Sequence, residues 1–216
     1  MKEPVKYWDK IADKYDKTDK QFEQIHFKII ENTKKYLNVS DVVLDYGCAT
    51  GTKAFELAGN VKKIQGIDLS SKMIENAKSK AVELNIDNVN FTHATIYDER
   101  YKRESFDVIL AFNILHLVED NRKAMRRIAE LLKPDGLLIS TTPCLKEKMA
   151  FLMKSKLYFY LLLIKLGLLP NMVKRFTFSE LYDLIAIGNL EIIEAEKIFH
   201  WMSYCFYCSK KIETIE

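Results

Sequence analysis

The chain has 216 residues, the length of one domain with an elaboration, and hydrophobic residues make up 48% of it. With 29% charged residues, this composition excludes disordered, collagen-like and coiled-coil proteins and indicates a globular protein with a full core. The 33 basic and 30 acidic residues leave a net charge of +3, which is too small to indicate a nucleic-acid partner by itself.

The first predicted elements are two helices. Trp8, Ile11, Ala12 and Tyr15 share one face of a short amino-terminal helix, and residues 22–37 form the second. Strands and helices then alternate with short connections, which predicts a parallel, doubly wound α/β sheet with helices on both faces. The predicted strands cover residues 41–45, 64–68, 89–92, 106–112 and 137–142. One predicted helix between them covers residues 52–58. A second begins after a cap at Ser70 or Ser71, and a third begins after a cap at Asp120.

The pattern changes after the fifth strand, which follows a predicted turn at residues 133–136. Residues 149–169 predict a long apolar helix, and residues 178–187 predict another helix with Ser179 as its cap. Two final strands, at residues 191–197 and 201–209, are expected to form an antiparallel hairpin around Phe199 and His200.

The amino terminus and the cysteines indicate the compartment. The first ten residues are charged and lack the apolar core of a signal peptide. Cys205 and Cys208 form a C-x-x-C pair, but no second ligand pair accompanies it, so we expect ordinary strand residues and no metal site. These features predict a cytoplasmic protein with reduced thiols.

A glycine-bearing turn follows the first strand. Asp45 ends the strand, and Gly47 and Gly51 allow a tight turn and a close approach of a ligand to main-chain N–H groups. The dinucleotide fingerprint G-x-G-x-x-G is not met beyond Gly47. Asp68 ends the second strand, where a carboxylate can accept both hydroxyls of a ribose or can cap the next helix. In a parallel sheet such groups meet at the carboxyl ends of the strands.

Five segments in this order resemble the class I S-adenosylmethionine-dependent methyltransferases. They are YWDKIADKYD (7–16), VVLDYGCATG (42–51), GIDLSSKMIENAK (66–78), FDVILAFNILHLVED (106–120) and LLKPDGLLIST (131–141). The resemblance implies a seven-stranded Rossmann-like sheet, S-adenosylmethionine as cofactor and S-adenosylhomocysteine as product. We interpret residues 1–216 as one methyltransferase domain, with amino-terminal helices (1–38), a cofactor-binding core (41–145), a helical insertion (146–178) and a carboxyl-terminal helix and hairpin (179–216).

The resemblance also implies roles for individual residues. The methionine part of the cofactor would be held by Asp45 and by the backbone around Gly47, Cys48, Ala49 and Gly51. Asp68 would bind the ribose, and Leu69 and Met73 would lie against the adenine. The family's Gly-Asp pair after strand three is Ala94-Thr95 here, so the backbone N–H of Thr95 or Ile96 is expected to make that adenine contact. Asn113 would lie next to the sulfonium, and Tyr7, Trp8 and Tyr15 would close over the cofactor or serve only for packing.

The methyl acceptor is less constrained. Much of the rate of a methyl transfer can come from alignment, but His116, near the pocket mouth, is our candidate general base, with a structural role as the alternative. His200 is a weaker candidate. Pro143-Cys144 resembles the nucleophilic dipeptide of cytosine-C5 methyltransferases, but it follows strand five rather than strand four. No Asn-Pro-Pro-Tyr motif follows strand four either, which disfavours N-methylation of bases.

The apolar run 157–164 has too many apolar residues for one helix face. We interpret residues 149–175 as a lid over the acceptor pocket, in which Gly167 and Pro170 end the helix and turn the chain back. Core packing, a dimer interface and a membrane-surface contact are the alternatives. The chain is therefore expected to methylate O, N or S of a small, largely apolar acceptor, as a monomer or homodimer without nucleic acid. The alternatives are a membrane-surface methyltransferase of a lipid or quinone precursor and a non-catalytic cofactor-binding module.

Overall fold

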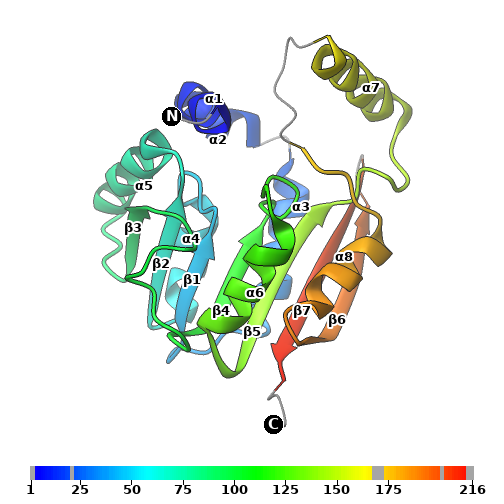
Figure 1. Ribbon diagram of the computed structural model, residues 1–216. Helices are drawn as coiled ribbons and strands as arrows, with labels where there is room; N and C mark the ends of the chain where they lie inside the picture. The colour runs from blue at the N-terminus through cyan, green and yellow to red at the C-terminus, as the bar shows by residue number, and fades with distance from the viewer. Residues whose placement is uncertain (1–2, 20–21, 167–172, 200–201, 213–216) are drawn as a thin grey trace.

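A computed structural model describes residues 3–19, 22–166, 173–199 and 202–212. Its centre is a seven-stranded sheet in the order β3-β2-β1-β4-β5-β7-β6, in which β7 runs antiparallel to both neighbours and the other pairs are parallel (Figure 1). The strands are β1 (Val42–Tyr46), β2 (Lys63–Asp68), β3 (Val89–His93), β4 (Phe106–Phe112), β5 (Leu132–Pro143), β6 (Leu190–Phe199) and β7 (Ser203–Lys211). The predicted doubly wound sheet with a final antiparallel hairpin is confirmed.

Helices cover both faces of the sheet and give it two cores. On one face pack α3 (Glu23–Lys34), α4 (Thr52–Leu57), which continues into the 3-10 turn η3 (Ala58–Asn60), and α5 (Ser71–Glu83). On the other face pack α6 (Asn121–Leu131) and α8 (Phe178–Ala186). Alternate residues of β4 serve the two cores, since Val108 and Leu110 join the first and Ile109 and Ala111 the second. A strand that is apolar on both faces is therefore buried on both, as its sequence predicts.

The predicted helix caps are confirmed in two of three cases. The Ser70 hydroxyl accepts from the Met73 N–H at 3.1 Å and begins α5, and the Asp120 carboxylate accepts from the Lys123 N–H at 2.9 Å and begins α6. Ser179 does not cap α8. Thr177 does, because Glu180 follows it by three residues and completes a reciprocal capping box.

Two local predictions need correction. Residues 133–136 lie within β5 as a bulge: Leu132 pairs with Phe106 and Leu137 with Val108, and Asp135 has a φ of 60°. The amino-terminal helix is broken into α1 (Glu3–Ile11), the 3-10 turn η1 (Ala12–Lys14) and α2 (Tyr15–Asp19).

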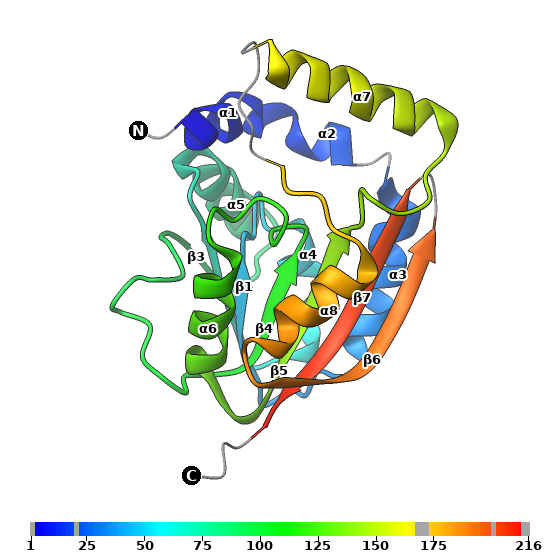
Figure 2. The ribbon, with the colours of Figure 1, turned by 45° about the vertical axis from the view of Figure 1, so that its right-hand side comes forward.

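The apolar insertion forms α7 (Phe151–Lys165), which lies with α1 and α2 at the carboxyl end of the parallel strands (Figure 2). No residue of α7 is buried, so the alternative that it adds to the core is wrong. The lid and the other two alternatives stay predictions. Gly167, Pro170, His200 and the start of the last predicted strand at Trp201 lie outside the described residues. Among the helices that are described, none has the length and hydropathy to cross a membrane.

Candidate functional site

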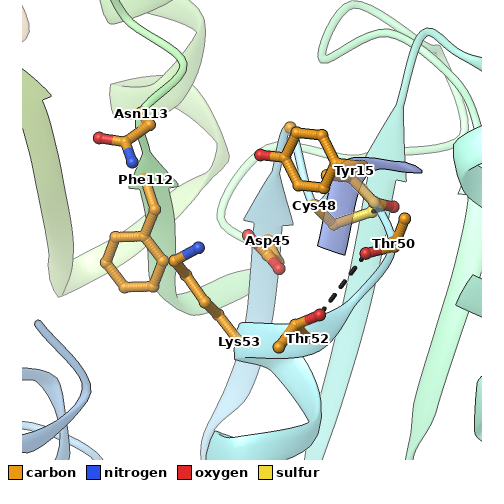
Figure 3. Close-up of a pocket in the computed structure, with 10 residues that line it drawn as sticks. Tyr15, Asp45, Cys48, Thr50, Thr52, Lys53, Phe112 and Asn113 are labelled. Atoms are coloured by element: carbon orange, nitrogen blue, oxygen red, sulfur yellow. Dashed lines mark hydrogen bonds between the residues drawn. The ribbon is translucent and has the colours of Figure 1, made fainter. Parts of the chain in front are cut away.

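A cavity opens where β1 and β4 end, as expected for a parallel sheet (Figure 3). It brings together six of the residues singled out from the sequence: Tyr15, Asp45, Gly47, Cys48, Ala49 and Asn113. Four lining residues escaped the sequence reasoning: Thr50, Thr52, Lys53 and Phe112. Thr50 lies near the end of the glycine turn, and Thr52 and Lys53 begin α4. The predicted start of a helix directly after the turn could have indicated these three residues.

The glycine turn has a backbone that few other residues adopt. Gly47 and Gly51 have φ values of +77° and +80°, and Ala49 is also left-handed at 47°. A Cβ on Gly51 would come within 2.5 Å of the Phe91 ring. The N–H groups of Gly47 and Cys48 both donate to the Ile67 carbonyl, at 2.9 and 3.0 Å, and fix the turn to β2. The glycines thus hold the turn tight at the rim of the cavity.

Asp45 is the buried charge of this cavity. Only 3% of the residue is exposed, and no hydrogen bond reaches its carboxylate from the part of the chain that the structure describes. Burial raises the pKa of Asp45 to about 7, the nearby Lys53 ammonium opposes this shift, and Asp68 adds to it. Lys53 lines the same cavity. A carboxylate in this state gains stability from any cation that enters beside it.

Asp68 does not line the cavity but is joined to its rim. Its carboxylate accepts from the Ala49 N–H at 3.1 Å and from the Ser70 N–H at 2.8 Å. Burial raises the pKa of Asp68, while these backbone hydrogen bonds act in the opposite direction. One carboxylate therefore links the glycine turn to the start of α5 and has a fixed orientation.

The amino-terminal helices are attached to the same region by acidic side chains. Asp9 accepts from the Ser70 hydroxyl at 2.6 Å, and Asp16 accepts from the Thr50 hydroxyl at 2.5 Å and pairs with Lys80. Asp13 accepts from the Asn76 side chain at 3.2 Å. The sequence reasoning missed these aspartates, although spacings of four and three residues predict one acidic helix face.

The predicted aromatic cover lies on these helices. The Trp8 ring meets Tyr7 edge-on, with centroids 5.3 Å apart, and Tyr15, with centroids 6.4 Å apart. Of the three, only Tyr15 lines the cavity, and Tyr7 is 41% exposed. Trp8 thus packs against Tyr15 from outside the cavity, and Tyr7 packs against Trp8.

The predicted adenine contacts are dispersed. The Met73 side chain is buried at 1% exposure, and Ile96, also 1% exposed, belongs to the core beneath α6. Leu69 is 48% exposed, and Thr95 is exposed. The backbone N–H groups of Thr95 and Ile96 donate no hydrogen bond within the described part of the chain. Of these two N–H groups, that of the exposed Thr95 is available to a ligand, whereas Ile96 is buried together with the Met73 side chain.

Two buried polar atoms without partners follow β4. Among the described residues nothing bonds to Asn113 Oδ1 or His116 Nδ1. Burial lowers the pKa of His116 to about 4, so the imidazole is neutral at pH 7. His116 does not line the cavity. The Lys174 N–H donates to its carbonyl at 2.7 Å, which ties the segment after α7 to this loop.

The cysteines are packing residues. Cys205 lies in the core beneath α6 and α8, whereas Cys208 lies in the core on the opposite face, so the pair cannot share a metal ion. Cys144 is fully buried in a core at the end of β5. No group of three or more His, Cys, Asp or Glu side chains able to hold a metal occurs among the described residues.

Comparisons with known proteins give relatives of this site. A family described as a methyltransferase domain matches residues 37–186. An uncharacterized methyltransferase, YcgJ of Bacillus subtilis, is 36% identical in sequence over 44% of this chain. The YcgJ structure superposes on this chain with a TM-score of 0.70 and 19% identity, and the superposition covers 87% of this chain and 100% of the YcgJ structure. The sequence match covers 37% of the YcgJ protein, so the chain spans only about a third of the first relatives it matches.

One further relative and one protein of similar fold have named reactions. A ubiquinone biosynthesis O-methyltransferase of Rickettsia canadensis is 25% identical over 83% of this chain and 75% of its own length. A geranyl diphosphate C-methyltransferase of Streptomyces coelicolor, solved with S-adenosylhomocysteine, superposes with a TM-score of 0.69 at 12% identity over 89% of this chain and 80% of that one.

Proposed function

The chain belongs to the S-adenosylmethionine-dependent methyltransferases, and from that premise we propose that it transfers a methyl group to O, N or S of a small, largely apolar acceptor. One observation carries the proposal: the cavity at the carboxyl ends of β1 and β4 holds the buried, unbonded Asp45 carboxylate, the Lys53 ammonium and the buried Asn113 amide oxygen. Two opposite charges and an acceptor atom, fixed in advance, suit a zwitterionic ligand.

The residues present fit the family's cofactor. S-Adenosylmethionine supplies a methyl group on a positively charged sulfur, and its methionine end carries an ammonium and a carboxylate. We assign the ammonium to the buried Asp45 and the carboxylate to the half-buried Lys53, because each group then meets the opposite charge. The unpartnered oxygen of Asn113 would accept a hydrogen bond from the same end of the ligand.

The nucleoside end is assigned to the neighbouring rim. Asp68 is held by two backbone N–H groups, so it needs little reorganisation to accept ribose hydroxyls. The exposed Leu69 and the N–H group of the exposed Thr95 would meet the adenine, whereas the buried Ile96 N–H would first have to become accessible. Tyr15, supported by Trp8, would close the cavity from the amino-terminal side.

The residues after β4 would act on the acceptor. With a pKa near 4, His116 is neutral at pH 7 and can accept a hydrogen bond, but it is a weak base. The unpartnered Nδ1 suits a role in orienting the acceptor's X–H group better than a role as general base, and for either role the acceptor would have to reach beyond the described cavity, which His116 does not line. Alignment by the cavity walls would then supply most of the rate.

The comparisons do not narrow the proposed acceptor atom to O, N or S, since the ubiquinone biosynthesis relative methylates oxygen and the solved neighbour methylates carbon. The ubiquinone biosynthesis enzyme, which aligns with 83% of this chain, favours a phenol or quinol with an apolar substituent. Such an acceptor is compatible with the alternative predicted from the sequence, a membrane-surface methyltransferase of a lipid or quinone precursor. The other alternative, a module that binds the cofactor without catalysis, is distinguished by the test below.

The test is a screen of the purified protein with phenols, quinols, thiols and amines, read by the release of S-adenosylhomocysteine. Turnover with one class identifies the acceptor atom. Tight S-adenosylhomocysteine binding without turnover on any class would support the non-catalytic module. Absence of binding would contradict the whole assignment.

A further inference from the structure

The segment around α7 differs in charge from the rest of the chain. Residues 148–179 contain six basic residues and no acidic one. The rest of the chain has 27 basic and 30 acidic residues, so this segment accounts for the whole excess of positive charge. A cationic segment on an otherwise slightly acidic protein predicts an anionic partner at that place.

α7 presents an apolar stripe to solvent, interrupted by Ser155. Helix residues that are three, four or seven positions apart share a face, and the exposed large side chains of α7 follow this spacing. Their exposed fractions range from 50% to 88%, and with Leu166 just after the helix they are Phe151, Leu152, Tyr158, Phe159, Leu162 and Leu166. We call this set the α7 stripe. An exposed apolar surface of this kind marks an interaction site rather than a feature of a free monomer.

Three lysines border the α7 stripe. By helix geometry Lys154 and Lys165 follow one edge and Lys156 the other. All three are exposed, and within the described residues none forms an ion pair. A lysine at such an edge can lay its alkyl stem on the apolar surface and extend its ammonium group to a phosphate. An apolar face with cationic residues along both edges is the arrangement of a helix that lies in a membrane interface.

We propose that the α7 stripe docks on the surface of an anionic lipid bilayer, with the apolar side chains at the acyl boundary and the three lysines among the headgroup phosphates. A second copy of the chain fits less well. A two-fold contact between α7 helices would bring two sets of lysines together, and residues 148–179 provide no acidic group to offset them.

The docked orientation would bring the site close to the membrane. α7 lies at the same end of the sheet as the cavity (Figure 2). The segment that returns from α7 contacts the loop after β4, where the Lys174 side chain meets the Glu119 carbonyl and Asn121. An apolar acceptor could then pass from the bilayer to the cavity. This last consequence rests on the proposed function, whereas the docking itself does not.

Flotation of the purified chain with vesicles, without cofactor or acceptor, tests the docking. Wild-type protein should float with phosphatidylcholine vesicles that also contain phosphatidylglycerol, less with phosphatidylcholine alone, and less at high salt. Phe159→Asp should reduce the bound fraction about tenfold or more, because it places a charge in the α7 stripe. Phe27→Asp is the matched control: Phe27 is 67% exposed on α3, and its variant should float like the wild type.

Three outcomes would overturn the proposal. The first is wild-type protein that remains unbound with anionic vesicles. The second is a Phe27→Asp variant that loses flotation as strongly as Phe159→Asp. The third is a dimer in light scattering that Phe159→Asp dissociates, with no flotation of either protein. S-Adenosylhomocysteine affinity, measured in parallel, should be equal in both variants and reports that each is folded. Flotation without methyl transfer on any acceptor would contradict the proposed function alone.

Discussion

Asp45→Asn should stabilise the protein without ligand and weaken its binding of S-adenosylhomocysteine. Burial raises the pKa of Asp45 from 3.8 to about 7. Each pH unit of such a shift corresponds to about 1.4 kcal/mol, so the ionised carboxylate costs the folded state up to about 4 kcal/mol above pH 7. Asparagine keeps the shape and removes the charge.

The pH dependence gives this prediction its sign. Between pH 3.8 and about 7 the folded wild type binds one proton more than the unfolded chain at Asp45, so its stability falls as the pH rises through this window. The Asp45→Asn variant has no titrating group at this position, so its stability does not fall for this reason. The difference in unfolding free energy between variant and wild type should therefore be near zero at pH 4, grow toward pH 7 and then stay constant.

Urea unfolding at a series of pH values measures the difference in unfolding free energy between variant and wild type. Calorimetry measures the affinity for S-adenosylhomocysteine, which should fall about tenfold or more in Asp45→Asn because the ligand's ammonium loses its charged partner. Asp107→Asn is a control of opposite sign. Although burial acts to raise it, the pKa of Asp107 is lowered overall by hydrogen bonds from Lys133 and the Val42 N–H, so that variant should lose stability above pH 4. If Asp45→Asn were no more stable than the wild type at pH 8, the buried-charge argument would be wrong.

Three further substitutions test the rest of the site. Asp68→Ala should weaken S-adenosylhomocysteine binding by a few kcal/mol at most, and unchanged affinity in calorimetry would contradict the ribose assignment. His116→Ala should lower turnover roughly 10²-fold or more if the imidazole takes the acceptor's proton, with cofactor affinity retained; near-normal turnover would make it structural. Asp16→Asn should loosen the amino-terminal helices and speed S-adenosylhomocysteine dissociation measured by stopped flow, whereas Asp13→Asn, which loses only the bond to Asn76, should change it less.

The sheet could be predicted because its strands carry strong local signals. β4 is apolar on both faces and bounded by polar residues, and its predicted and observed bounds coincide. The glycines at 47 and 51 were readable because their positive φ values restrict the residue type. Helix caps could be predicted because the capping hydrogen bond joins residues three positions apart. The prediction of Ser179 as the cap of α8 was wrong because Thr177, with Glu180 three residues later, forms a reciprocal capping box at the start of that helix.

The contacts across the site could not be predicted, because they join residues distant in sequence. Nothing near Asp16 in the chain indicates that it meets Thr50 and Lys80. Lys53 was missed for a similar reason: a lysine in the first turn of a helix is usually solvated, and only the fold places it beside Asp45. For α7 the composition correctly indicated an unusual helix, but apolar content alone does not distinguish burial in the protein from contact with another phase.

The most direct test of the central assignment is a crystal structure of the chain with S-adenosylhomocysteine. We expect the ligand's ammonium about 3 Å from the Asp45 carboxylate, its carboxylate toward Lys53 and its ribose hydroxyls on Asp68. A ligand bound elsewhere, or bound in this cavity with its ammonium away from Asp45, would show that the cofactor site is assigned wrongly.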